Sequence, residues 1–132
     1  MKSINDKLFW IVMVLLGIYI LYSKGMIMAN FKSLSPKVAY EMVQNDDNLT
    51  LLDVRTIEEF KKDGHLAGAK LIPLNQLSTH LDMLDRSKKV LVYCRSGNRS
   101  ASAARLLGNE GFTVFNLDGG ISAWRSQKLP VE

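Results

Sequence analysis

The stretch that indicates the fold class is VLVYCRSGNRSASAARLL, residues 90–107. It opens with an apolar, β-branched run that predicts a buried strand over residues 89–93. A short polar loop follows, and the small residues from Ser100 to Asn109 predict a helix that ends before Gly111. A strand that passes through a tight loop into a helix is typical of α/β proteins with a parallel sheet.

The chain on both sides of this stretch alternates in the same way. Ser35 followed by Pro36 indicates a helix start, and Thr56 with Glu59 forms a capping-box pattern at the start of another helix. Further strands are predicted at residues 49–54, 70–74 and 113–117, and further helices at residues 77–84 and 121–126. We therefore expect an α/β fold whose parallel sheet is covered by helices on both faces, with ligands bound beyond the carboxyl ends of the strands.

A separate hydrophobic segment precedes this pattern. Residues 8–22 read LFWIVMVLLGIYILY and carry no charge. We predict a single-span membrane anchor over residues 1–27, with residues 26–28 available to lengthen the span, then a linker at 28–34 and a domain at 35–132. A cleaved secretory signal is the alternative, because a run of this length also fits the apolar region of a signal peptide.

The net charge of +4 belongs to the hydrophobic segment and its flanks. Residues 1–37 hold five lysines and one aspartate, and residues 38–132 hold the remaining 12 basic and 12 acidic residues. A domain with equal numbers of basic and acidic residues gives no reason to expect nucleic-acid binding. The lysines on the two flanks give no clear positive-inside bias. Because a charged tail is costly to move across a membrane, we expect the domain on the extracytoplasmic side.

The chemistry is predicted to centre on Cys94, the single cysteine of the chain. One cysteine excludes an internal disulfide and a zinc site built on several cysteines. The loop after Cys94 should turn backbone amides towards the sulfur, with Gly97 allowing a positive φ and with Arg95 and Arg99 adding positive potential. These effects together lower the pKa of a thiol, so Cys94 is expected to be a nucleophile at neutral pH.

The spacing within the loop separates two kinds of chemistry. Cysteine-based phosphatases place five residues between the cysteine and an arginine that grips phosphate, whereas four residues separate Cys94 from Arg99 here. A shorter loop makes a smaller cradle, which suits one added sulfur atom better than a phosphate group. The spacing therefore argues against a phosphatase or an arsenate reductase.

Three separated stretches resemble the rhodanese family of sulfurtransferases. They are LLDVRTIEEFKKDGHLAGAKLIP at residues 51–73, YCRSGNRS at residues 93–100 and LDGGISAW at residues 117–124. The resemblance implies a parallel sheet of about five strands and a reaction through a persulfide on Cys94. It implies that Asp53 and Arg55 support the site, that no metal or organic cofactor is used, and that the active-site loop comprises Arg95, Ser96, Gly97, Asn98, Arg99 and Ser100.

Two hypotheses of different class follow from these features. In the first, the protein is an enzyme that moves a sulfane sulfur from a small donor such as thiosulfate to a thiol or cyanide acceptor. In the second, it is a membrane-tethered module that delivers sulfur or senses redox state without turnover of its own. A lone cysteine provides no internal resolving thiol, so in either case the acceptor comes from outside the chain.

Overall fold

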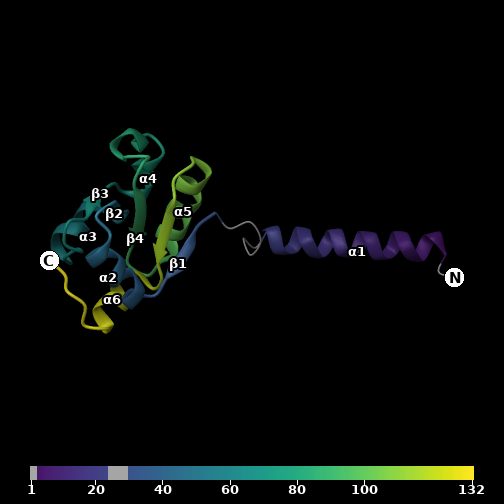
Figure 1. Cartoon of the computed structure of the whole chain (residues 1–132), viewed down its shortest axis with the longest axis horizontal. Helices are drawn as coiled ribbons and strands as arrows, with labels where there is room; N and C mark the ends of the chain where they lie inside the picture. Colours follow the sequence, from purple (N-terminus) through teal and green to yellow (C-terminus); the bar gives the residue numbers. More distant parts are fainter. Residues whose placement is uncertain (1–2, 24–29) are drawn as a thin grey trace.

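The computed structural model describes residues 3–23 and 30–132, which form an isolated N-terminal helix and an α/β domain (Figure 1). The helices are α1 (Ile4–Ser23), α2 (Pro36–Asn45), α3 (Ile57–Lys62), α4 (Leu74–Leu77), the 3₁₀ turn η1 (Leu81–Met83), α5 (Asn98–Asn109) and α6 (Gly120–Ser126). The strands are β1 (Lys32–Leu34), β2 (Leu49–Asp53), β3 (Lys70–Leu71), β4 (Lys89–Tyr93) and β5 (Val114–Leu117). Residues 26–29, which the sequence assigned partly to the span and partly to the linker, lie outside the described residues.

The sheet has five strands in the order β1-β5-β4-β2-β3, and every pairing is parallel. The predicted α/β class and the number of strands are therefore confirmed. The apolar run at β4 occupies the centre, with β2 paired along its whole length and β5 on its other side. This position explains why β4 is buried on both faces and lacks an alternating polar pattern.

Helices cover both faces of the sheet, as expected. On one face, Ala103, Ala104 and Leu107 of α5 and Leu77 of α4 pack on the strands. On the other face, the apolar side chains of α2 and α6 pack on Leu51, Leu91 and Leu117, with Trp124 buried among them. The small side chains of α5 let that helix lie close to the sheet. The loop that precedes α5 is therefore held near the carboxyl end of β4.

Both predicted helix caps are present. The Ser35 hydroxyl accepts from the amide of Val38 and Pro36 is the first residue of α2. The Thr56 hydroxyl accepts from the amide of Glu59, while the Glu59 carboxylate accepts from the amide of Thr56. Local hydrogen bonding of this kind depends on residues close in sequence, which is why it could be predicted.

The structure corrects the prediction that residues 28–34 are only a linker. Lys32–Leu34 form strand β1, which pairs with β5 at the edge of the sheet. The Asn30 side-chain amide donates to the carbonyl of Arg105 (3.1 Å) and to Asn109 Oδ1 (2.7 Å). A three-residue strand shows no periodicity of its own, and its place depends on partners about 80 residues away along the chain.

The predicted helix at residues 77–84 is wrong. Helix α4 already ends at Leu77, and beyond it only Leu81–Met83 of the predicted range are helical, as the separate turn η1. The carbonyl of Gln76, which would accept from an amide four residues on in a continuing helix, contacts the Thr79 hydroxyl (3.0 Å) and His80 Nδ1 (2.7 Å). These side-chain contacts compete with helical hydrogen bonds, so the helix ends early.

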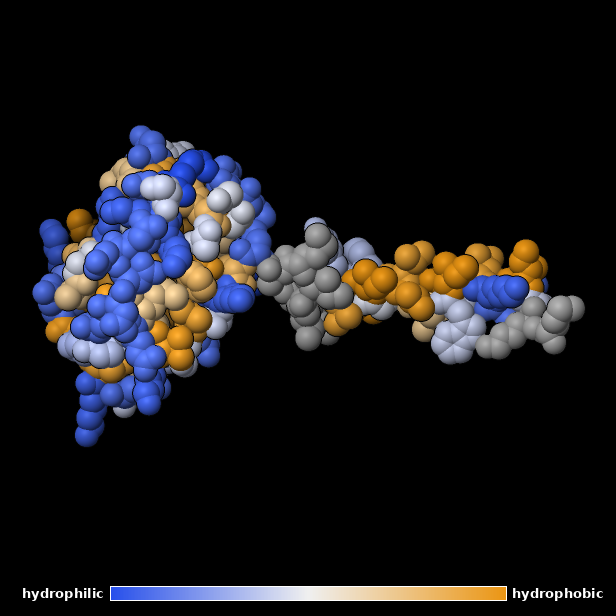
Figure 2. Space-filling view, viewed as in Figure 1, coloured by the Kyte–Doolittle hydropathy of each residue, from blue (hydrophilic) through white to orange (hydrophobic). Residues whose placement is uncertain are grey.

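Helix α1 contains the predicted span at residues 8–22. It is 20 residues long, none of its side chains is buried, and apolar side chains run along it (Figure 2). Its length and composition are sufficient to cross a membrane, and a signal sequence near an N-terminus has the same properties. The helix is therefore a candidate anchor or signal sequence.

Candidate active site

Cys94 lies directly after β4, at the carboxyl end of the central strand. Its neighbour Tyr93 pairs with Asp53 at the end of β2, and the Tyr93 carbonyl accepts from the amide of Val54 (3.1 Å). The Cys94 residue is only 1% exposed. The expected position beyond the strand ends is therefore correct, and the sulfur lies beneath the loop that follows rather than on the open surface.

The loop turns back over the sulfur within three residues. Gly97 adopts φ of 101° and is the N-cap of α5, which begins at Asn98 rather than at Ser100 as predicted. Because the helix starts two residues earlier, its first turn lies next to Cys94. The side chains of Arg95, Ser96 and Asn98 are exposed on the outer side of this loop.

Three donors from the loop point at the Cys94 sulfur. The amide of Gly97 lies 3.1 Å from Sγ, and the amide and hydroxyl of Ser100 each lie 3.4 Å from it. The Ser100 residue is fully buried. The predicted nest of amides is present, and Ser100 adds a side-chain donor to it.

These donors control the ionisation of Cys94. Burial by itself raises the pKa of the thiol, but hydrogen bonds from Ser100 and from the amides of Gly97 and Ser96 outweigh it. The pKa of Cys94 therefore lies below its ordinary value. The direction is the one expected from the sequence, but the principal causes are hydrogen bonds rather than the two arginines.

Helix α6 holds the loop from its other side. The amide of Ile121 donates to the Cys94 carbonyl (2.9 Å), and the amide of Ser122 donates to the Arg95 carbonyl (3.1 Å). Gly120 has a φ of 61°, and a Cβ placed on it would lie 2.5 Å from both of these carbonyl oxygens. The glycine pair at 119–120 therefore allows α6 to approach the loop backbone closely.

Asn116 is a site residue that the sequence analysis missed. It lies in β5 opposite Val92, is 4% exposed, and its side-chain amide lies 3.4 Å from the carbonyl of Gly97. Its Oδ1 has no hydrogen-bond partner among the described residues. A polar side chain within the otherwise apolar strand VFNL was the signal that could have revealed it.

Asp53 and Arg55 form a buried ion pair at the end of β2. Arg55 Nη2 lies 2.7 Å from Asp53 Oδ2, and it also donates to the carbonyl of Gly64 (2.7 Å). Burial alone lowers the pKa of Arg55, but the contacts with Asp53 outweigh it and raise that pKa. The pair therefore joins β2 to the loop at Gly64, and the Arg55 guanidinium also lies over the ring of Tyr93, the residue before Cys94.

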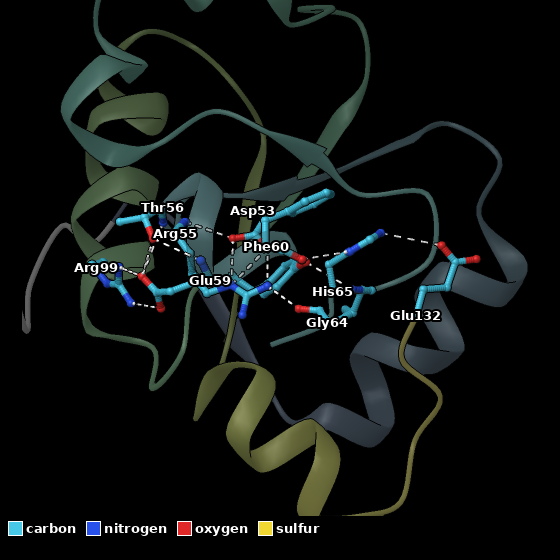
Figure 3. A network of polar contacts seen from close by, with 11 residues as sticks. Asp53, Arg55, Thr56, Glu59, Phe60, Gly64, His65, Arg99 and Glu132 are labelled. Carbon is cyan, nitrogen blue, oxygen red and sulfur yellow. Dashed lines mark hydrogen bonds and ion pairs between the residues drawn. The ribbon is translucent and has the colours of Figure 1, made fainter. Parts of the chain in front are cut away.

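The two arginines of the loop have different environments. Arg99 donates through Nη1 and Nη2 to the two carboxylate oxygens of Glu59, at 2.7 and 2.8 Å (Figure 3). Hydrogen bonds from Arg99 are the largest cause that lowers the pKa of Glu59, to about 2. Arg95 is exposed and forms no ion pair with any residue of the ranges 3–23 and 30–132. Sequence reasoning saw Glu59 only as part of a helix cap.

A pocket lies beside the Arg99 side chain. It is lined by Val54, Arg55, Thr56, Pro73, Leu74, Asn75 and Arg99. It lies at the carboxyl ends of the strands, the usual ligand position in such sheets. Within the described part of the chain, no group of three or more His, Cys, Asp or Glu side chains is arranged to hold a metal ion.

Comparison with known proteins agrees with this geometry. The profile of the family described as Rhodanese-like domain matches residues 35–127. The chain is 32% identical to the putative sulfurtransferase YtwF of Bacillus subtilis over 99 residues, which cover 75% of this chain and 95% of the relative. It is 34% identical to the thiosulfate sulfurtransferase GlpE of Ectopseudomonas mendocina over 100 residues, covering 75% and 89% of the two chains.

A solved structure has the same fold. The crystal structure of a rhodanese-related protein from Thermoplasma volcanium superposes with a TM-score of 0.71 at 33% identity, covering 77% of this chain and 98% of that one. A family match over most of the chain, together with relatives that align over nearly their whole length, defines the class. The chain belongs to the family of rhodanese-like domain proteins and has sulfurtransferase homologues.

Proposed function

We propose that the protein is a sulfurtransferase that carries a sulfane sulfur as a persulfide on Cys94. The observation that supports this most directly is the set of three donors around the sulfur, at 3.1 to 3.4 Å. Donors fixed in this way stabilise a thiolate, which is the nucleophilic form of cysteine. The same donors are suited to a persulfide, whose negative charge also resides on sulfur.

The reaction proceeds in two displacements. In the first, the Cys94 thiolate attacks the outer sulfur of a donor. For thiosulfate, the bond between the two sulfur atoms breaks and its electron pair leaves with sulfite. In the second, an acceptor nucleophile attacks the outer sulfur of the persulfide, and the electron pair of that S–S bond returns to Cys94 as thiolate. A thiol acceptor then leaves as a persulfide, and cyanide leaves as thiocyanate.

The structure of the loop favours sulfur over phosphate as the transferred group. Arg99, the arginine that would have to grip phosphate oxygens, is held by Glu59 in a bidentate ion pair. The amides that face inward converge on the sulfur itself. The site therefore stabilises an anion centred on the cysteine sulfur, not a larger oxyanion beyond it.

We further propose that α1 tethers the domain to a membrane, with the domain on the extracytoplasmic side. The support is the length and full exposure of this apolar helix, and the cost of moving the charged N-terminal tail across a bilayer. A reporter enzyme fused to the C-terminus, active on one side of a membrane only, tests the orientation. Activity on the cytoplasmic side would overturn that part of the proposal.

The sulfur-transfer proposal is tested on the full chain in mild detergent, with Cys94→Ser as the matched variant. The protein is incubated with thiosulfate or with an organic persulfide, and intact mass reports sulfur added to Cys94. Addition of cyanide should then release thiocyanate and restore the original mass. A folded parent that gains no sulfur from either donor would contradict the enzyme hypothesis and favour a non-catalytic module.

A further inference from the structure

Three arginines lie on the segments that follow strands β2 and β4, and carboxylates neutralise two of them. Arg55 lies buried against Asp53. Arg99 is held by Glu59 through two parallel hydrogen bonds, the geometry in which an arginine is most fully satisfied (Figure 3). Of the three, Arg95 alone forms no ion pair within residues 3–23 and 30–132, and it is exposed to solvent.

Glu59 has further contacts at the start of its own helix. The Glu59 Oε1 atom contacts the amide and the hydroxyl of Thr56, both at 3.3 Å, which attaches the carboxylate to the first turn of α3. Its pKa of about 2, set chiefly by hydrogen bonds from Arg99, keeps Glu59 ionised at neutral pH. Glu59 also raises the pKa of Arg99 most strongly, and the charge of Cys94 is among the further causes.

This arrangement has a consequence for the charge of the sulfur donor. A guanidinium paired with a carboxylate gives much less attraction to a third group than a free one, because the two fields largely cancel. A doubly negative donor such as thiosulfate would also approach the Glu59 carboxylate, a like charge. The inward-facing donors at the sulfur stabilise one negative charge, and they are already engaged by the thiolate.

The pocket beside Arg99 has walls that suit an organic group. Val54, Pro73 and Leu74 contribute its apolar side, and Thr56 and Asn75 contribute neutral polar groups. The remaining lining residues are Arg55 and Arg99, both in ion pairs. An uncharged carbon substituent can therefore contact this surface without loss of ionic interactions.

We propose that Glu59 is a specificity-determining residue that, by neutralising Arg99, selects organic persulfides over thiosulfate as sulfur donors. The inference rests on the proposed sulfur transfer and adds the donor class to it. In the reaction, the Cys94 thiolate attacks the outer sulfur of R–S–SH. A Cys94 persulfide forms, the S–S bond of the donor breaks, and its electron pair leaves with the thiolate RS⁻.

The test compares Glu59→Gln with Glu58→Gln in the full chain in mild detergent. Glutamine at position 59 retains a capping-box acceptor for the amide of Thr56 but frees the Arg99 charge. Glu58 is exposed in the same turn of α3, so its variant removes the same charge without the ion pair. In Glu59→Gln we expect the KM for thiosulfate to fall about tenfold and the KM for N-acetylcysteamine persulfide to change less than about twofold.

A second readout does not depend on turnover. The rates of Cys94 alkylation by iodoacetate, which is anionic, and by iodoacetamide, which is neutral, are measured in each variant. The ratio of the iodoacetate rate to the iodoacetamide rate does not depend on the thiolate population, because both reagents react with the thiolate. We expect this ratio to rise severalfold in Glu59→Gln but not in Glu58→Gln. The rise should disappear when Arg99→Gln is combined with Glu59→Gln, because the effect acts through the Arg99 charge.

The outcomes separate this inference from the proposed function. An unchanged alkylation ratio in Glu59→Gln, or an equal rise in Glu58→Gln, would overturn the specificity role whether or not the parent transfers sulfur. Equal changes in the KM values of both donors would overturn it too. A parent that transfers no sulfur while the ratio still shifts would sink the proposed function and leave only the electrostatic effect of Glu59.

Discussion

The hydroxyl of Ser100 lies 3.4 Å from the sulfur of Cys94 and donates to it from the first turn of α5. Both residues are buried, so water does not compete strongly for this contact. Ser100 was expected only as the last member of the loop. Its contribution to the thiolate depends on the early start of α5, which turns the side chain inward.

Ser100→Ala should weaken the nucleophile. Loss of one hydrogen bond to a charged group, worth about 1 kcal/mol or more, should lower the rate of Cys94 alkylation about fivefold at neutral pH. Because Ser100 lowers the pKa of Cys94, the alkylation profile should move to higher pH in the variant. Ser102→Ala, on the exposed side of the same helix, is the control. Identical pH profiles for the two variants would contradict the assignment.

Gly120→Ala should displace the loop. The added Cβ would lie 2.5 Å from the carbonyl oxygens of Cys94 and Arg95, so either α6 or the loop must move. We expect sulfur transfer to fall about tenfold or more, since small displacements of reacting groups have large effects on rate. Gly111→Ala is the matched control, because it also has a positive φ but nothing lies within 4 Å of its Cβ. An equal loss of sulfur transfer in Gly120→Ala and Gly111→Ala would mean that backbone strain alone causes the effect.

Asp53→Ala should be strongly destabilising. It would leave the Arg55 guanidinium buried without its carboxylate, a change that costs about 3–5 kcal/mol in the free energy of unfolding. Chemical denaturation of the full chain in detergent measures this loss. Asp82→Asn, an exposed carboxylate in η1, should be near neutral. If the denaturation midpoints of both variants match that of the parent, the buried pair has no structural role.

Glu59 should make stability depend on pH in the acid range. Its folded pKa of about 2 lies below the ordinary value of 4.5. The group therefore stabilises the fold above pH 4.5, and this contribution is lost as the pH falls towards 2. Thermal unfolding should show Glu59→Gln up to about 5 °C less stable than the parent at pH 7, because an ion pair of this exposure contributes at most about 1 kcal/mol.

The difference in melting temperature should narrow as the pH is lowered through this range. Glu58→Gln, which removes an exposed carboxylate from the same turn, should show no comparable narrowing. A gap between parent and Glu59→Gln that stays constant from pH 7 down to pH 2.5 would show that the ion pair does not set the pKa of Glu59.

The local features of this protein were readable from its sequence. The apolar run of β4, the caps at Ser35 and Thr56 and the positive φ at Gly97 each depend on residues a few positions apart. The alternation of strands with helices was sufficient to predict a parallel α/β sheet. Helices and strands space their apolar residues differently, and each pattern can be recognised within a single element. The position of Cys94 at a strand end followed from the same reasoning.

The relationships that define the site depend on residues far apart in the chain. Arg99 meets Glu59 across 40 positions, and Asn116 reaches the carbonyl of Gly97 across 19. Strand β1 exists because β5 pairs with it, although neither its length nor its composition indicates a strand. Sequence periodicity reports which face of an element is apolar, but packing of the helices against the sheet decides which polar groups meet. Cys94 and the amides around it could therefore be predicted from the sequence, whereas only the tertiary structure shows that the Ser100 hydroxyl also donates to the sulfur and that Glu59 pairs with Arg99.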